Sequence, residues 1–344
     1  MRFTLRRTSS RALAVSMTAV LSMGALAACS SDDNSDSNNS DSSSDTRTVT
    51  DATGDEVEIP ADPERVAAFD NRIFQVLADW DIDLVSAPVT LIPETNTKYH
   101  EDTEIHDTGS HREPNLEELV ASEPDLIITG NRYGQHYDEM KELLPDTAIV
   151  STDFGRDDEG EQVDPLEDTL KSITNLIGEI FEKEDEAEGL VNDFDEAKDR
   201  AKAAYNADET VVGLIVAGGD ITYSAPTHGR SVGPVFDMLD LTPALERDGS
   251  SNHKGDDISV EAIAQSNPDW ILVMDRDAAV SDSGDDSRPA DEVLTDSEAL
   301  QNVTAVEDGN IVYFPDDFYT TEDIEAYTTV LNSTADAFEE HDSE

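Results

Sequence analysis

Short apolar runs alternate with amphipathic stretches along the chain from about residue 60. Runs such as "DLIITG" and "DWILVMD" are nearly continuous in apolar residues, which is typical of parallel strands covered on both faces. The stretches between them, such as "NRIFQVLADW" and "SVEAIAQS", place apolar residues at helical spacing. This alternation predicts an α/β protein. The expected strands are 65–70, 84–88, 125–130, 147–152, 210–218, 269–275 and 310–314.

One interval, from Pro165 to about Asn206, interrupts the alternation because it contains no strand pattern. Its apolar residues fall on the faces of two successive helices, and the second helix is strongly charged outside its apolar stripe. The interval separates four expected strands from three. We therefore expect two lobes with parallel central sheets, at 47–182 and 207–344, joined by a long helix at 183–206.

Two segments of eighteen residues, "NLEELVASEPDLIITGNR" (115–132) and "SVEAIAQSNPDWILVMDR" (259–276), resemble each other. Most of what they share is the packing pattern of a short helix followed by a strand. Each also has a glutamate in the first helical turn, Glu117 or Glu261, and an arginine at the strand exit, Arg132 or Arg276. Open α/β sheets bind ligands outside the carboxyl ends of their strands. Singly these residues are explained by a helix-start charge or an ordinary ion pair, but their recurrence favours a function.

A third arginine is expected at the same kind of edge. The segment "VVGLIVAGGDITYSAPTHGRSVGPVFDML" leads from a strand through a glycine-rich loop to Arg230 at the start of a helix. Arginine keeps its charge and donates hydrogen bonds in a fixed fork, which suits anionic ligands. The three arginines therefore predict an anion-binding cleft.

The first residues have the pattern of a secretory signal. Residues 1–28 combine a basic start with an apolar run that ends in "LAAC", and Cys29 is the only cysteine of the chain. This pattern resembles the lipobox of bacterial lipoproteins, which implies cleavage before Cys29 and a lipid anchor on the outer face of the membrane. The Ser, Asp and Asn residues that follow have no apolar partner, and 29–46 is expected to be a disordered tether.

The chain is very acidic, with 79 Asp and Glu against 22 Lys and Arg and a net charge of −57. Four of the basic residues lie in the signal, so the remainder carries a net charge of −61. Such a charge excludes nucleic acid as a partner and is typical of a solvated, salt-adapted surface. An anionic ligand would need a local group of cations.

The signal, the two lobes and the signatures "GSHREPNLEELVASEPDLIITGNR" and "HKGDDISVEAIAQSNPDWILVMDRDAAV" resemble the class III solute-binding proteins of ABC importers, above all the lipoproteins that bind ferric catecholate siderophores. The resemblance implies a shallow cleft between two lobes and an arginine triad, here Arg132, Arg230 and Arg276, facing a ferric complex of about −3 charge. It also implies that His253 and Tyr319 complete the iron coordination where the siderophore leaves sites open.

The same resemblance implies that Glu117 and Glu261 dock onto the arginines of a permease dimer with its ATPase, and Glu118 competes with Glu117 for this role. It implies a monomer without an intrinsic cofactor and without catalysis, which delivers Fe(III)-siderophore as cargo. The sequence does not name the siderophore.

Other functions fit less well. The motif "GRSVG" matches the nucleophile elbow of α/β-hydrolases, but no suitable histidine follows it and a loop separates it from its strand, so Ser231 is interpreted as a helix-start residue. A zinc or manganese carrier needs clustered histidines, whereas those of this chain are scattered. Haem and cobalamin remain alternative ligands of the same fold.

Overall fold

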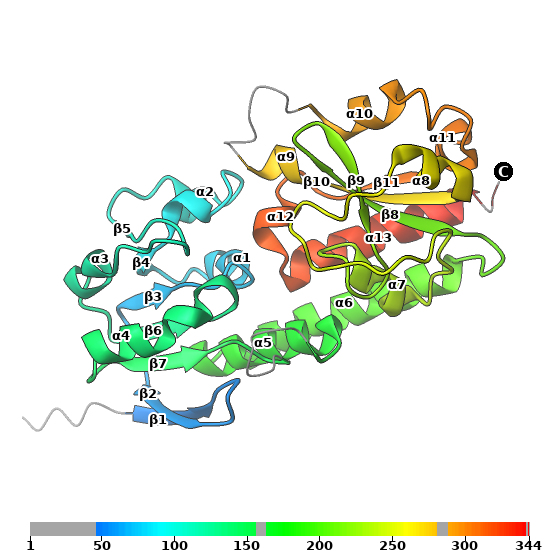
Figure 1. Cartoon of the computed structure of the whole chain (residues 1–344). Coiled ribbons are helices and arrows are strands. Elements are labelled where there is room, and N and C mark those ends of the chain that lie inside the picture. Colours follow the sequence, from blue (N-terminus) through cyan, green and yellow to red (C-terminus); the bar gives the residue numbers. More distant parts are fainter. Residues whose placement is uncertain (1–45, 156–162, 281–287, 342, 344) are drawn as a thin grey trace, which may run out of the picture. The chain divides into compact units, whose positions relative to one another are not determined.

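The computed structural model describes residues 46–155, 163–280, 288–341 and 343 (Figure 1). The signal, Cys29 and the tether up to residue 45 lie outside the described residues. Thr46 was expected to belong to the tether, but it is the first residue of strand β1. Strands β1 (Thr46–Thr50) and β2 (Glu56–Pro60) form an antiparallel hairpin that the sequence analysis missed.

The N-terminal lobe contains a five-stranded sheet in the order β5-β4-β3-β6-β7, and every pair of neighbours is parallel. Its strands are β3 (Val66–Ala68), β4 (Leu84–Ala87), β5 (His106–Asp107), β6 (Leu126–Thr129) and β7 (Ala148–Ser151). Its helices are α1 (Phe74–Asp79), α2 (Thr97–His100), α3 (Leu116–Ala121) and α4 (Tyr137–Leu143), with 3-10 turns η1 (Val89–Leu91) and η2 (Asn131–His136).

The C-terminal lobe contains a four-stranded sheet in the order β11-β10-β8-β9. Its strands are β8 (Val211–Ala217), β9 (Asp220–Ser224), β10 (Trp270–Asp275) and β11 (Ile311–Tyr313). Strands β8, β10 and β11 are parallel, but β9 is antiparallel to β8. The expected loop after β8 is therefore a hairpin, which turns at Gly218 and Gly219 with positive φ angles. The edge strand β9 is the exception to the expected parallel sheet.

The remaining helices of this lobe are short except for the last. They are α7 (Gly233–Leu239), α8 (Val260–Ser266), α9 (Arg276–Ala279), α10 (Ala290–Asp296), α11 (Thr304–Glu307), α12 (Phe318–Thr321) and α13 (Ile324–His341).

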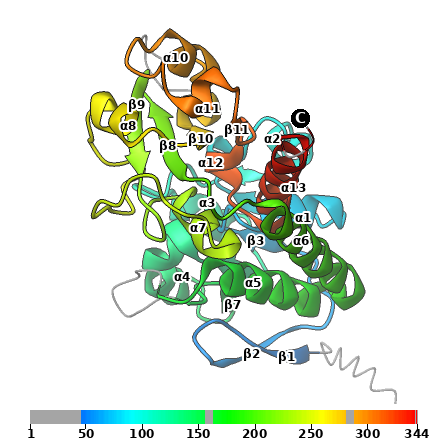
Figure 2. The same ribbon diagram turned by 90° about the vertical axis from the view of Figure 1, so that its right-hand side faces the viewer.

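Two helices, α5 (Leu166–Phe181) and α6 (Glu184–Ala204), occupy the interval that separates the sheets. The predicted apolar stripe of α5 is buried, and so are Ala187, Phe194, Ala197 and Ala201 of α6. Helix α6 packs against α5 and, along much of its length, against α13 (Figure 2). The role of α13 as the partner of α6 was not predicted.

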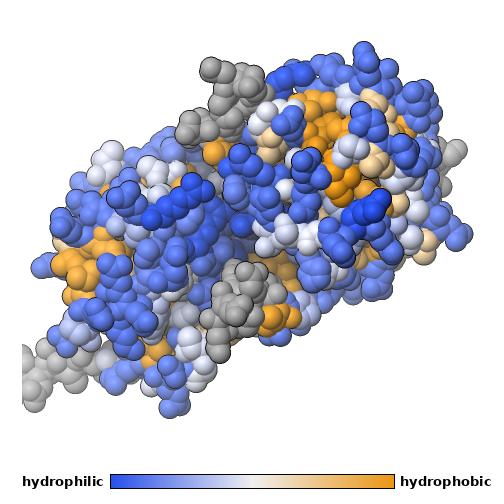
Figure 3. Space-filling view, viewed as in Figure 1, coloured by the Kyte–Doolittle hydropathy of each residue, from blue (hydrophilic) through white to orange (hydrophobic). Residues whose placement is uncertain are grey.

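Both sheets are buried on both faces, which explains their nearly continuous apolar strands. In β6, Leu126 and Ile128 join one apolar cluster while Ile127 joins another, and strand β10 alternates in the same way. The predicted α/β class is thus confirmed. On the face shown in Figure 3, hydrophilic residues cover most of the surface, in keeping with the net charge of −57.

Candidate ligand-binding site

The three predicted arginines surround the ring of Tyr319. The guanidinium carbons of Arg132, Arg230 and Arg276 lie 5.1, 5.4 and 5.0 Å from the ring centroid. The tyrosine belongs to the short helix α12 and exposes only 7% of its surface. Each cation is within the range of a cation–π interaction. The structure therefore gathers four of the sequence-predicted site residues in one place.

Arg132 and Arg276 both follow the end of a parallel strand, as the sequence predicts. Arg132 lies in η2, directly after strand β6, and Arg276 is the first residue of α9, directly after β10. Arg132 also donates to the backbone carbonyl of Tyr319 at 3.2 Å, so an N-terminal-lobe residue contacts a C-terminal-lobe segment. Burial and the nearby Arg230 lower the pKa of Arg132, which shows that like charges are crowded here.

Arg230 faces Tyr319 but does not leave a parallel strand. The sequence predicts it at the exit of a parallel strand, but it follows β9, which runs back along β8. The tight turn beyond it, where Ser231 has a φ of +65°, precedes α7. The predicted strand exit is therefore wrong for Arg230, although its guanidinium still faces Tyr319.

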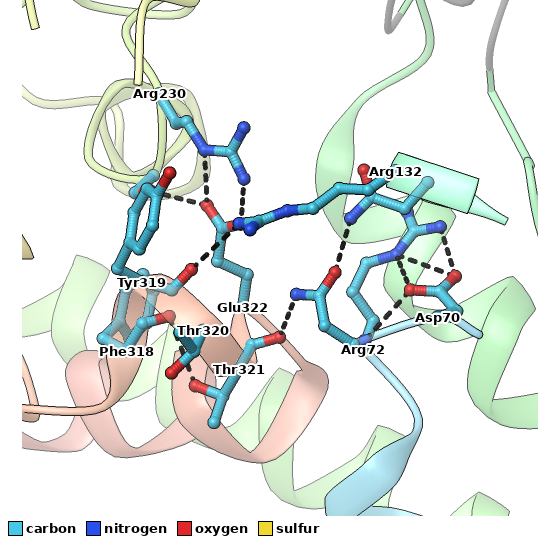
Figure 4. A network of polar contacts seen from close by, with 12 residues as sticks. Asp70, Arg72, Arg132, Arg230, Phe318, Tyr319, Thr320, Thr321 and Glu322 are labelled. Atoms are coloured by element: carbon cyan, nitrogen blue, oxygen red, sulfur yellow. Dashed lines mark hydrogen bonds and ion pairs between the residues drawn. The ribbon is translucent and has the colours of Figure 1, made fainter. Parts of the chain in front are cut away.

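Glu322 lies between Arg230 and Arg132 and was not predicted (Figure 4). Arg230 donates to both of its carboxylate oxygens, with Nε 3.2 Å from Oε1. Ser231 Oγ donates to Oε1 at 2.6 Å, and Arg132 Nη2 is 3.6 Å from Oε2. Burial alone would raise the pKa of Glu322, but Arg230 and Arg132 outweigh burial and hold it below the ordinary value. The carboxylate is therefore ionised.

Arg276 has unused donor capacity. Its Nε is buried and has no hydrogen-bond partner among the residues that the structure describes. A buried donor without a partner costs about 1–3 kcal/mol. Arg276 therefore adds an unsatisfied cationic donor beside Tyr319.

Two histidines lie within electrostatic reach of the cluster. Burial, then Arg276 and Arg230, lower the pKa of the predicted His253, which is partly buried in the loop before α8. Burial, then Arg132, lower the pKa of His111, which the analysis of the signature "GSHREPN" did not single out. Both imidazoles are thus favoured in their neutral form, which is the form that binds metal ions.

A cavity of about 920 Å³ adjoins the cluster and is lined by Arg72, Arg230, Ser231 and Glu322, among others. Arg72 is a fourth arginine that the sequence analysis missed. It forms a buried ion pair with Asp70, with Nη2 and Oδ2 2.6 Å apart, and in Figure 4 this pair lies beside the Glu322 network. Since Asp70 neutralises it, Arg72 adds little net charge to the cleft.

Hydrogen bonds connect the N-terminal lobe with the segment around α12. Besides Arg132, Asn71 Nδ2 donates to the carbonyl of Thr321 at 2.9 Å, and Thr95 Oγ1 donates to Asp317 Oδ2 at 2.5 Å. The segment Asp317–Glu322 thus contributes both to the cation cluster and to the contact between the lobes.

The two predicted docking glutamates are placed alike. Glu117 is exposed in the first turn of α3, and Glu261 is exposed in the first turn of α8. Glu118, the alternative in the first lobe, accepts a bond from His106 Nδ1 at 2.7 Å if that nitrogen carries its proton. The side chain of Glu118 is therefore engaged with its own lobe, which favours Glu117 as the outward-facing residue.

The geometry around Ser231 differs from that of a nucleophile elbow. Its hydroxyl donates to Glu322, and its carbonyl accepts from Tyr327 Oη at 2.9 Å. The cap of α7 is Val232, so the interpretation of Ser231 as a helix-start residue is wrong. Within the described parts of the chain, no three His, Cys, Asp or Glu side chains are grouped to hold a metal ion.

Two α/β lobes, a helical connection and a cation-lined site between strand exits define a two-lobed ligand-binding protein of the class III type. The chain belongs to the periplasmic binding protein family, whose model matches residues 66–318.

Two relatives of this chain are named as siderophore-binding proteins. The petrobactin-binding protein YclQ of Bacillus subtilis is 27% identical over 259 residues, which are 74% of this chain and 76% of the relative. The ferric-anguibactin-binding protein FatB of Vibrio anguillarum is 31% identical over 218 residues, which are 63% of this chain and 65% of the relative.

Solved structures agree in fold. The crystal structure of YclQ superposes with a TM-score of 0.69 at 24% identity, covering 86% of this chain and 99% of the other. The siderophore-binding protein BauB, solved with two molecules of acinetobactin and ferric iron, gives a TM-score of 0.70 at 24% identity with the same coverage.

Proposed function

We propose that this protein is the extracytoplasmic binding component of an ABC importer, and that it captures an anionic ferric siderophore of the catecholate type for iron uptake. The observation that carries the proposal is the cluster of Arg132, Arg230 and Arg276 around Tyr319 in a protein of net charge −57. So acidic a chain gathers three guanidinium groups at a cost in repulsion and desolvation, which an anionic ligand offsets. The names of the relatives support the same ligand class.

The chemistry of the cluster suits a ferric catecholate. Guanidinium groups donate bidentate hydrogen bonds to catecholate oxygens and stack on aromatic rings. The phenol of Tyr319 and the imidazole of His253 are proposed as iron ligands for a siderophore that leaves coordination sites open. The protein supplies binding and orientation and no catalysis, and the iron complex is its cargo and not a resident cofactor.

Titration of intrinsic fluorescence tests this function. The purified protein is titrated with ferric catecholate, ferric hydroxamate and ferric citrate complexes, haem, cobalamin, and zinc and manganese ions. We expect quenching to saturate at the lowest concentration with a ferric catecholate. Tighter binding of haem or cobalamin would instead select the alternative ligands of this fold.

We propose that Glu117 and Glu261 dock the two lobes, residues 47–182 and 207–344 with the connecting helix 183–206, onto a permease dimer. Replacing both glutamates by Ala is expected to reduce siderophore-dependent iron uptake at least about tenfold, because each removes an exposed charge that pairs with a permease arginine. Ligand affinity of the purified variant should stay the same. Uptake of radiolabelled iron by cells measures the effect.

The matched control for docking is Glu118→Ala, which removes a neighbouring carboxylate that is engaged with His106. Its uptake should remain near the wild-type rate. Loss of ligand binding in the Glu117 and Glu261 variant would place these residues in the cleft and contradict the docking role.

We propose that Cys29 carries a lipid anchor that holds the monomeric receptor on the outer face of the membrane. No helix in the described parts of the chain is long and apolar enough to cross a bilayer. A curated relative, YfiY of Bacillus subtilis, is named as a probable siderophore-binding lipoprotein. Cys29→Ala should release the protein from membranes into the medium, as fractionation and immunoblotting would show; full retention on membranes would contradict the anchor.

A further inference from the structure

Glu322 places a carboxylate where the proposed ligand needs cations. Its side chain is 10% exposed and is held by Arg230 and Ser231, with Arg132 beside it (Figure 4). The bidentate partner and the hydroxyl leave the carboxylate little freedom. Its negative charge is thus a fixed part of the site.

The backbone of Glu322 adopts a left-handed conformation. Glu322 ends helix α12 with a φ of +49°, a left-handed conformation that glycine adopts with less strain. Ser231, its hydroxyl partner, is also left-handed, with a φ of +65°. Two non-glycine residues in this conformation face each other to form one hydrogen bond inside the cation cluster.

The hydrogen bonds of Arg230 and Arg276 differ. Arg230 is bound to Glu322 through two of its nitrogens, whereas Arg276 Nε has no partner among the described residues. Three guanidinium charges and one carboxylate leave two net positive charges around Tyr319, and the rest of the protein is strongly negative. A ligand with three negative charges would therefore exceed the charge of its site.

We infer that Glu322 determines ligand specificity by charge, and that it favours ferric complexes of net charge −1 over those of −3. The inference rests on the proposed function. Ferric iron with two catecholates, each of charge −2, has a net charge of −1 and two open coordination positions. Ferric iron with three catecholates has a net charge of −3 and no open position. The smaller charge fits two net cations, and the open positions suit ligands such as Tyr319 and His253.

Charge scaling provides the test. The Coulomb energy between Glu322 and a ligand grows in proportion to ligand charge, so removal of Glu322 acts three times as strongly on a −3 complex as on a −1 complex. If Glu322→Gln improves the affinity for a ferric bis-catecholate about threefold, it should improve that for a ferric tris-catecholate about thirtyfold. Fluorescence titrations of both variants with both complexes measure these ratios.

A control variant isolates the charge. Glu307→Gln removes one exposed carboxylate in α11. It should not change the ratio of the two affinities more than about twofold. The wild-type protein alone gives a further measurement, since it should bind the −1 complex at least as tightly as the −3 complex.

Equal changes for both complexes in Glu322→Gln would overturn the inference, and so would a tenfold wild-type preference for the −3 complex. Selective loss of the −1 complex would also overturn it, because Glu322 would then be an iron ligand. If the wild type binds neither complex, the proposed function fails as well. If it binds them and the ratio does not move, only the role of Glu322 fails.

Discussion

Replacing Arg132 and Arg276 together by Gln is expected to weaken ferric catecholate binding at least about a hundredfold. Each arginine can donate charge-assisted hydrogen bonds worth about 1.5–3 kcal/mol, and a factor of ten in affinity corresponds to about 1.4 kcal/mol. The two guanidinium carbons lie 5.1 and 5.0 Å from the centroid of the Tyr319 ring, so both arginines should contribute to the loss. Titration of intrinsic fluorescence, compared at two salt concentrations, measures the loss.

The variant leaves Arg230 in place on purpose. Arg230 is bound to Glu322 through two of its nitrogens. A variant without Arg230 would therefore mix the loss of a ligand contact with the loss of this buried ion pair. Arg288→Gln is a control that removes one cation away from the cluster, since Arg288 pairs with Asp296 on the surface. Unchanged affinity in the double variant would remove the basis of the proposed function.

The positions of the three arginines in the fold could be predicted from the sequence only in part. Arg132 and Arg276 were found because a parallel strand ends next to the helix start of its own unit, which is a local rule. Arg230 was assigned by the same rule, but the hairpin of β8 and β9 makes the rule inapplicable. The turn at Gly218 and Gly219, followed by "DITYS", was the available signal for that hairpin.

Glu322 could not be predicted because its role depends on contacts distant in the chain. Among 79 acidic residues, nothing in "YTTED" marks this one, and its partner Arg230 lies 92 positions away. The ion pair of Asp70 and Arg72 is local, but Asp70 also accepts a bond from Thr152, which lies 82 positions away. The prediction of the fold, in contrast, rests on apolar patterns that many residues share. A wrong assignment of a single residue, such as Thr46, therefore does not change the predicted fold.

Asp323 is expected to make the protein less stable as the pH rises from about 4 to about 7. It is 1% exposed, and one carboxylate oxygen, Oδ2, is buried without a hydrogen-bond partner among the described residues. Burial, with the charge of Asp317 nearby, raises the pKa of Asp323 to about 7 from 3.8. The folded state thus keeps a proton that the unfolded state releases, so stability from this group falls through that window. The total is on the order of 4 kcal/mol.

Asp323→Asn is the sharp test, because Asn is neutral and can still cap α13 through the backbone N–H of Ala326. We expect its stability gain over the wild type to grow between pH 5 and pH 7 and to level off above that, as thermal unfolding followed by circular dichroism would show. Part of the gain should come from Glu325, whose pKa burial, Asp323 and Asp79 raise to about 8. The exposed control Asp308→Asn should give a small, pH-independent change. A gain that is the same at pH 5 and pH 8 would mean that Asp323 is ionised throughout, which would contradict its raised pKa.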